Sequence, residues 1–255
     1  EFNEPSQIFT DEPMEFDVST VYGDTHLAIV PIPITEMEAE YTGNVHLFET
    51  IDPEQVEVNL IYEDGMKKRL DAFDVEDPGE IEGETKTVIH TDYGDADLVI
   101  HPVAVDKVEA VYDGYVYETE PFSKDAIHVV ATMVDGYSVE VTDFDCGQEK
   151  EITDETDINI KTDYGEAKCH IIPVRITSIS SDAGTVVAGG QVAIHKIYFQ
   201  YEDESVKEIS SHEVKFTDDT ASQVLQEGNN IFKFEYKGKE YELNIPAVNE
   251  AFAGS

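Results

Sequence analysis

The chain has 255 residues, with 56 Asp and Glu against 16 Lys and Arg, which gives a formal net charge of −40. A surface this acidic repels nucleic acid and anionic lipid, so both are poor partners. No apolar run reaches the roughly eighteen residues that a spanning helix needs, so we expect no membrane insertion by this fragment. A salt-adapted organism and an ordinary acidic surface protein would give the same charge balance.

One short stretch of sequence occurs three times at a fixed interval. TVYGDTHLAIVP at 20–31 is followed by TDYGDADLVIHP at 91–102 and TDYGEAKCHIIP at 162–173, so that Tyr22, Tyr93 and Tyr164 are evenly spaced. We use the term period for the spacing from Tyr22 to Tyr93, which equals the spacing from Tyr93 to Tyr164. A more distant copy, FEYKGKEYELNIP, places Tyr236 one position beyond the next full period. A fixed period indicates tandem units, and units of about seventy residues can each fold around one core.

In the first half of each unit, alternating apolar and polar side chains predict β-strands. In residues 56–62, VEVNLIY, mostly apolar side chains alternate with polar ones, which indicates a strand with one buried face, and residues 127–133 repeat the pattern. Both strands end at an Asp-Gly pair, Asp64-Gly65 and Asp135-Gly136, the strongest short-range hairpin signal. We expect the partner strands to run on to Phe73 and Phe144.

The repeated stretch itself predicts a closing hairpin. We expect residues 87–93 to form one strand, Gly94 and Asp95 to turn, and residues 96–101 to return. Leu98 and Ile100 then point inward, as do their counterparts Leu27, Ile29, Cys169 and Ile171. The proline that follows each copy cannot donate to a ladder, so strand pairing ends there.

The third unit is looser, because it lacks the Asp-Gly turn. Helix signals are weak, and one short turn within residues 220–228 is the best candidate. About seven short strands per unit, with a turn signal every ten residues or so, predict an all-β chain of antiparallel sandwiches. Short linkers with a proline at each junction favour an extended, semi-rigid rod.

The order of motifs resembles a known family. In the second unit V-x-K-V-E-A-V-Y-x-G is followed by an apolar strand ending in D-G, then V-T-D-F, the Y-G hairpin and I-x-P-V. This is similar to the bacterial immunoglobulin-like domains of the group 3 type, which recur in tandem on surface proteins of Gram-positive, often gut-dwelling, bacteria. The resemblance is clearest for 34–102 and 103–174 and weaker for 175–248. It implies immunoglobulin-like sandwiches, a bacterial cell-surface location and a spacer or adhesive role, and it does not imply an active site.

The resemblance also suggests where each unit begins. We predict that residues 1–33 are the C-terminal strands of a preceding immunoglobulin-like module, followed by modules at 34–103, 104–174 and 175–248 and a tail at 249–255. The opposite phase, in which each unit begins with its hairpin, stays open. A lone hairpin is marginal in water, so we expect residues 1–33 to pack on a neighbour or to be the least ordered part. The anchor and the secretion signal are expected outside this fragment.

The two cysteines, Cys146 and Cys169, both lie in the second unit. Their counterparts one period earlier are Val75 and Leu98, so both positions are expected to be apolar and buried. Two interpretations remain open. The cysteines are free thiols that act as small hydrophobic residues, or they form one intradomain disulfide, which the extracellular environment permits.

Among the thirteen tyrosines, Tyr115 and Tyr117 are the candidates for contact with a partner. Tyrosine is large and amphipathic and is common at interfaces. Tyr41 and Tyr112 match across the repeat, which favours a core or corner role, whereas the counterparts of Tyr115 and Tyr117 one period earlier are Asn44 and His46.

No catalytic, cofactor or metal motif is present in the sequence. It has no P-loop, G-x-S-x-G, EF-hand spacing or paired histidines, so we expect a non-enzymatic protein without a cofactor or metal. The favoured hypothesis is a monomeric adhesin or stalk that binds a host protein such as a mucin, a matrix protein or an immunoglobulin. The alternative is a passive spacer in a cell-wall-associated glycoside-degrading enzyme.

Overall fold

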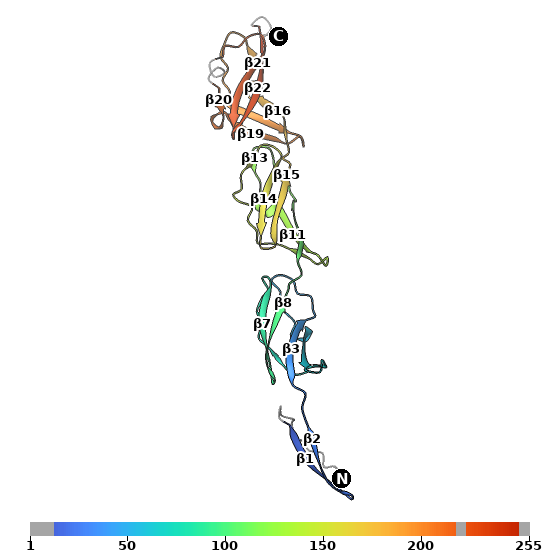
Figure 1. Ribbon diagram of the computed structural model, residues 1–255. Helices are drawn as coiled ribbons and strands as arrows, with labels where there is room; N and C mark the ends of the chain where they lie inside the picture. Colours follow the sequence, from blue (N-terminus) through green and yellow to red (C-terminus); the bar gives the residue numbers. More distant parts are fainter. Residues whose placement is uncertain (1–12, 218–222, 250–255) are drawn as a thin grey trace. The chain divides into compact units, whose positions relative to one another are not determined.

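The computed structural model describes residues 13–217 and 223–249, and this part of the chain is all-β, as predicted (Figure 1). Strands are accompanied only by the short 3-10 turns Pro53–Gln55, Lys124–Ala126 and Ser211–Glu213. Within the described ranges no helix is long and apolar enough to cross a membrane. The predicted helical turn at 220–228 begins outside the described residues, and residues 223–227 are not helical. Apart from Asn249, the predicted tail also lies outside them.

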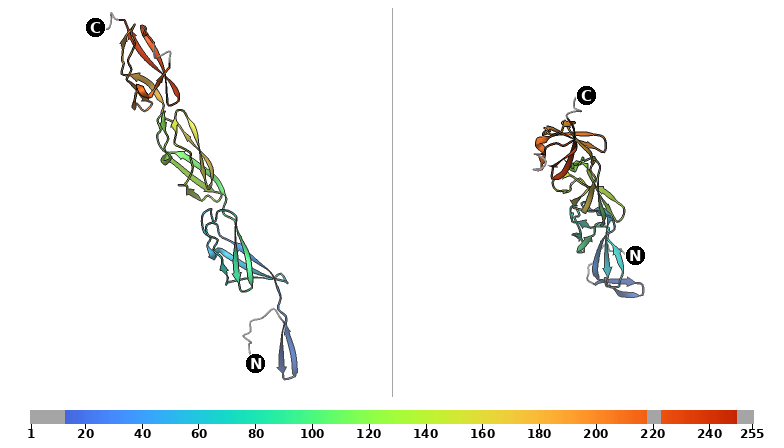
Figure 2. Two further views of the ribbon diagram at one scale, coloured as in Figure 1. Left: turned by 90° about the vertical axis from the view of Figure 1, so that its left-hand side faces the viewer. Right: turned by 90° about the horizontal axis from the view of Figure 1, so that it is seen from above.

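The chain divides into two compact units. The first runs to Ala104 and includes Met133–Asp135, and the second contains Val105–Thr132 and the residues from Gly136 onward. Within each unit most strands pair with the strand next to them in the sequence, as the similar colours of such pairs in Figures 1 and 2 show. In the described residues pairing is antiparallel except for two short parallel pairs, Val105–Tyr112 (β9) with Gly165–Ile171 (β15) and Val186–Val187 (β17) with Lys239–Val248 (β22), and an isolated parallel bridge between Tyr117 and Val174.

The first unit contains a two-stranded hairpin and two three-stranded sheets. The sheet orders are β1-β2, β3-β4-β5 and β6-β7-β8. Their strands are β1 (Met14–Thr20), β2 (Gly23–Ile29), β3 (Ile34–Tyr41), β4 (Val56–Tyr62), β5 (Lys67–Arg69), β6 (Asp74–Val75), β7 (Thr85–Thr91) and β8 (Gly94–Ile100). Val58 and Leu60 of β4 share one hydrophobic cluster with Leu98 of β8. The two three-stranded sheets therefore form the layers of one sandwich, called the first sandwich below.

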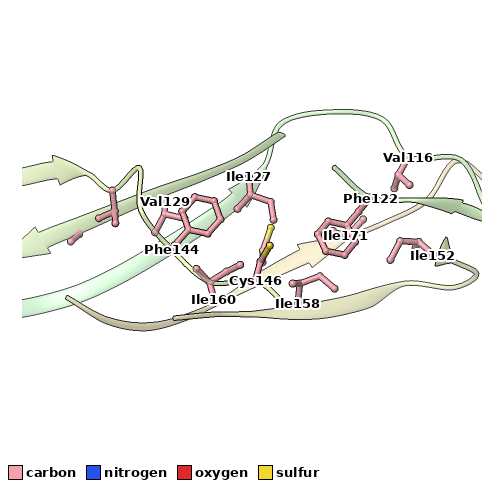
Figure 3. Close-up of a cluster of buried hydrophobic side chains, with 13 residues drawn as sticks. Val116, Phe122, Ile127, Val129, Phe144, Cys146, Ile152, Ile158, Ile160 and Ile171 are labelled. Atoms are coloured by element: carbon pink, nitrogen blue, oxygen red, sulfur yellow. The ribbon is translucent and has the colours of Figure 1, made fainter. Parts of the chain in front are cut away.

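The second unit begins with seven strands, five of which repeat strands of the first sandwich one period later. The other two, Glu120–Pro121 and Glu151–Ile152, pair with each other. The seven strands are β9 (Val105–Tyr112), β10 (Glu120–Pro121), β11 (Ile127–Met133), β12 (Ser138–Glu140), β13 (Glu151–Ile152), β14 (Thr156–Thr162) and β15 (Gly165–Ile171). Here β9 pairs with β15 at Ala110 and Cys169, which joins the two layers into one sheet of order β12-β11-β9-β15-β14. Its core, shown in Figure 3, defines the second sandwich.

The third group of strands has the most aromatic core. Its strands are β16 (Ile176–Ser181), β17 (Val186–Val187), β18 (Lys196–Tyr201), β19 (Val206–Ser210), β20 (Lys215–Phe216), β21 (Gly228–Tyr236) and β22 (Lys239–Val248). The sheets β16-β18-β19 and β17-β22-β21-β20 face each other across Phe199, Phe234 and Tyr241, with ring centroids 5.3 to 5.8 Å apart between Tyr241 and the two phenylalanines. This is the third sandwich.

The closing hairpin forms as expected, but its turn was predicted at the wrong residues. Thr91 pairs with Gly94, so Asp92 and Tyr93 make the turn, and Gly94 already belongs to β8. The Thr91 hydroxyl accepts the Tyr93 N–H at 3.0 Å and donates to the Gly94 carbonyl at 2.8 Å. Gly94 has a φ of 121°, a conformation that residues with a Cβ rarely adopt. Glycine is therefore needed just after the turn and not within it.

The distant fourth copy is not equivalent to the other three. Tyr236 pairs with Lys239, and the turn consists of Lys237 and Gly238, both with positive φ. Tyr236 is a core strand residue, 5% exposed, whereas Tyr164 lies in a turn. The near-match between the Tyr164–Tyr236 spacing and one period is therefore not a continuation of the repeat.

The matched tyrosines Tyr41 and Tyr112 are corner residues. Their hydroxyls each accept a backbone N–H eleven residues further along, from Asp52 and Ser123, at 3.3 Å. A Cβ at Gly43 would lie 2.8 Å from the Tyr41 hydroxyl, so glycine keeps this corner open. The prediction that Tyr41 and Tyr112 are matched residues with a core or corner role is therefore confirmed.

Candidate functional site

The most unusual site in the described residues is a buried carboxylate in the second unit, which is built by the segment after β9. Val174, which follows β15, donates its N–H to the Val116 carbonyl at 2.8 Å and accepts the Glu118 N–H at 3.0 Å. Thr119 then adopts a positive φ of 76° and donates its N–H to Ile152. These contacts hold the Glu118 side chain between the second sandwich and strands β16 and β22 of the third.

Glu118 is only 5% exposed, yet its carboxylate is surrounded by donors. One oxygen accepts the Tyr241 hydroxyl at 2.9 Å and lies 3.0 Å from the Lys239 Nζ, and the other accepts the Ile176 N–H at 2.9 Å. A buried charge is costly unless it is paired and hydrogen-bonded, and here both conditions are met. All three donors belong to the third sandwich.

Two other groups around Glu118 are affected by the same burial. Burial, followed by the hydrogen bond to Glu118, raises the pKa of Tyr241 well above its usual range. Burial alone would lower the pKa of Lys239, but its bonds to Glu118 and Asp154 outweigh this and raise the pKa. Both side chains therefore remain protonated at neutral pH, Tyr241 as a neutral donor and Lys239 as a cation.

Further polar contacts surround the carboxylate. Tyr117 donates its hydroxyl to Asp203 at 2.7 Å, and its ring packs edge-on against Tyr201 with centroids 4.8 Å apart. Burial raises the pKa of Tyr201 to about 12, and its hydroxyl donates to the Glu118 carbonyl at 3.3 Å. Three ion pairs span the same boundary: Lys207 with Glu120, Lys237 with Glu151, and Lys239 with Asp154. Such partly solvent-exposed pairs contribute little individually, so the buried carboxylate is the principal polar contact.

The two tyrosines predicted as partner contacts have different surroundings. Tyr115 is 88% exposed, whereas Tyr117 is half-buried and used within the chain. The structure therefore does not bring them together as one surface. Contact between Tyr115 and a partner stays a prediction.

Both cysteines are buried free thiols in the core of the second sandwich. Figure 3 shows Cys146 among Ile127 and Ile158, and Cys169 is 0% exposed. Burial, and to a smaller degree the neighbouring Cys146, raises the pKa of the Cys169 thiol, which disfavours the reactive thiolate. The expected apolar surroundings are present, the two sulfurs are not bonded to each other in this structure, and formation of the disulfide on oxidation stays a prediction.

Sequence reasoning did not single out Glu118. One acidic residue among 56 Asp and Glu carries no signal by itself. Its counterpart one period earlier, however, is Leu47, so an acid occupies a position that is apolar in the first sandwich. Comparing residues one period apart drew attention to the cysteines, and the same comparison at position 118 would have identified Glu118.

The carboxylate of Glu118 makes its contacts within the chain. Each oxygen of the carboxylate is engaged within the chain, and water has little access to it. Across residues 13–217 and 223–249 no cluster of three or more His, Cys, Asp or Glu side chains could hold a metal ion. The site therefore connects the second sandwich to the third.

Comparison with known proteins adds little. No family model matches the chain, and no curated protein matches it. Among solved structures the chain is similar to the crystal structure of the S-layer protein rSbsC(31-844), with a TM-score of 0.21 and 14% identity over 94% of this chain. The chain spans 45% of the length of that structure. A TM-score of this size does not establish a common fold.

Proposed function

We propose that the chain is a non-enzymatic structural part of a bacterial cell-surface protein, in which tandem immunoglobulin-like sandwiches act as a stalk. Three separate hydrophobic clusters, drawn mainly from residues 34–100, 108–171 and 174–247, support a tandem arrangement. The observation that carries the proposal is the buried Glu118, which bonds the second sandwich to the third.

A flexible linker has no need of such a carboxylate. Bending at this boundary would separate Glu118 from Tyr241 and Lys239, and the charge would lose its partners. Removing one partner of a buried ion pair typically costs about 3–5 kcal/mol, which is enough to keep a two-state hinge closed. A stalk that holds a binding surface at a set distance requires joints of this kind.

The stiffness of the joint is testable in the full chain. Spin labels at Lys168→Cys and Glu235→Cys, both exposed, would report the distance distribution between the second and third sandwiches. We expect a narrow distribution that becomes broad in Glu118→Ala. The matched control is Glu120→Gln, which weakens only the surface pair with Lys207 and should leave the distribution narrow. Hydrogen exchange would verify that both sandwiches stay folded. An equally narrow distribution in folded Glu118→Ala would contradict the proposal.

We further propose that the stalk contributes an adhesive contact through Tyr115. Its 88% exposure leaves a large amphipathic ring available to a partner. Binding of the full chain to purified mucin, collagen and immunoglobulin would be compared with that of Tyr115→Ser, with Tyr93→Ser as the control because Tyr93 is also exposed. We expect at least one ligand to bind, with about tenfold weaker binding in Tyr115→Ser alone. Equal binding by both variants would exclude the role of Tyr115.

A further inference from the structure

Three hairpins in the chain share one register and one turn. In β1–β2, β7–β8 and β14–β15 the matching cross-strand pairs are Phe16 with Leu27, Thr87 with Leu98, and Ile158 with Cys169. Each turn is closed by a threonine hydroxyl that donates to the carbonyl of the following glycine, at 2.8 to 2.9 Å. The hairpins are therefore copies of one element, down to their hydrogen bonds.

Their surroundings differ. Leu98 and Cys169 are both 0% exposed, whereas Leu27, at the same position, is 47% exposed. Val18 is half-buried, although its counterparts Ile89 and Ile160 are both 0% exposed. The face that forms half a core in two hairpins is thus largely open to solvent in the first.

The structure shows what covers this face in the other two copies. A Cβ placed on Gly94 would meet the Met37 side chain of β3 at 3.7 Å, and one on Gly165 would meet Val108 of β9 at 3.5 Å. At Gly23 no atom of the described residues lies within 4 Å. The missing neighbour therefore corresponds to the front sheet of the repeat, formed by β3–β4–β5 in the first sandwich.

We propose that hairpin β1–β2 is the closing half of a further sandwich, and that its apolar face binds a front sheet of the same repeat supplied by the same polypeptide ahead of the hairpin. The repeat extends in that direction, because Phe2, Phe73 and Phe144 are evenly spaced at one period. A second copy of the chain is a poorer occupant. Its front sheets already cover their own hairpins, and two chains of charge −40 repel each other.

The test restores the front sheet to the full chain. A copy of residues 34–71, which contains β3, β4 and β5, would be fused before residue 1, so that one complete period precedes residue 34. The readout is the rate at which a soluble maleimide labels Leu27→Cys. Ala28→Cys is the matched control, because it points to the opposite face, where its counterpart Val99 stays 37% exposed in a complete sandwich. The native cysteines are buried and should react slowly.

We expect labelling of Leu27→Cys to slow by at least about 100-fold in the fusion, while Ala28→Cys reacts at an unchanged rate. A second fusion, with Val58→Ser and Leu60→Ser in the added copy only, should restore fast labelling. Hydrogen exchange should show protection of the added strands in the first fusion and not in the second.

Two outcomes would overturn the proposal. In one, Leu27→Cys reacts at the same rate in both fusions and the added strands exchange freely. In the other, Leu27→Cys is already protected in the unextended chain in a concentration-dependent way, which would show that a second copy covers the face.

Discussion

Hairpins β1–β2 and β7–β8 belong to the same compact unit and differ in what surrounds them. They share register, turn and hydrogen bonds, yet Leu27 is 47% exposed and Leu98 is 0% exposed. Strand pairing and turn geometry therefore follow from the local sequence, whereas burial depends on strands that lie far away in the chain. The same substitution should have different consequences at the two places, and the predictions below use this difference.

The largest effect is expected for the paired leucines. Leu98→Ala should destabilise the first sandwich by about 2–5 kcal/mol, because it leaves a cavity in a packed core. Leu27→Ala should change the stability of that sandwich by no more than about 0.5 kcal/mol. Hydrogen exchange of residues 56–62 across a urea series would measure both values. Similar losses for the two variants would mean that Leu27 is also part of a core.

The glycines after the turns should give a smaller effect. Gly94→Ala forces a residue with a Cβ to adopt a φ of 121°, which should cost about 1–2 kcal/mol in the first sandwich. Gly23→Ala carries the same strain but adjoins no core among the described residues, so the urea midpoint of the sandwich should not move. A shift of the midpoint in Gly23→Ala would show that the two hairpins are energetically coupled.

The threonine hydroxyl of the turn should contribute to stability about as much as one net hydrogen bond. Thr162→Val removes the bonds to Tyr164 and Gly165 and should destabilise the second sandwich by about 1 kcal/mol. Thr162→Ser keeps the hydroxyl and should recover most of the loss. Thr20→Val, the matched change in β1–β2, should leave the stability of the second sandwich unchanged. Thermal unfolding, monitored by hydrogen exchange, would compare the three variants.

The smallest effect concerns pH. The hydrogen bond to Asp95 raises the pKa of His90 above its ordinary value. A raised pKa in the folded state means that the stabilisation is complete below the unfolded pKa and is lost as pH rises through the folded value. The first sandwich should therefore become slightly less stable as pH rises above about 6.5. His90→Gln should weaken this dependence without abolishing it, because the pKa of His46 is also raised. Burial alone would lower the pKa of His46, but its hydrogen bonds to Asp135 and Glu49 outweigh this. Urea midpoints from pH 5.5 to 8.5 would detect it, and an increase in stability over that range for wild type would contradict the assignment.

Much of the fold could be predicted because the repeat shows the pattern of a given strand at more than one place in the chain. The alternation in 56–62 and 127–133 marks β4 and β11 with their correct inward faces. The partner strands were predicted to reach Phe73 and Phe144, but β5 ends at Arg69 and β12 at Glu140. Beyond Arg69 the Leu70 N–H still donates to the Val58 carbonyl, and the chain then leaves the sheet. The alternation of apolar and polar side chains does not indicate where a strand stops pairing.

The candidate site was less accessible to sequence reasoning. Tyr117 was recognised as unusual, but its partners Asp203 and Tyr201 lie far along the chain, in a sandwich whose loops do not follow the period of the repeat. Glu118 depends on donors from residues 176, 239 and 241, which no local pattern associates with it. The sequence therefore predicts the sandwiches well and the contacts between them poorly.

Glu118 stands where the first sandwich has Leu47, and this has a consequence for how such an array can evolve. A duplicated or recombined copy of the second sandwich would fit only ahead of a sandwich that offers a hydroxyl, an ammonium and a backbone N–H at matching positions. Placed before any other neighbour, it would carry an unneutralised acid into a dry contact. The carboxylate thus makes the second sandwich specific for the neighbour that follows it, so that the sandwiches of this chain are not interchangeable.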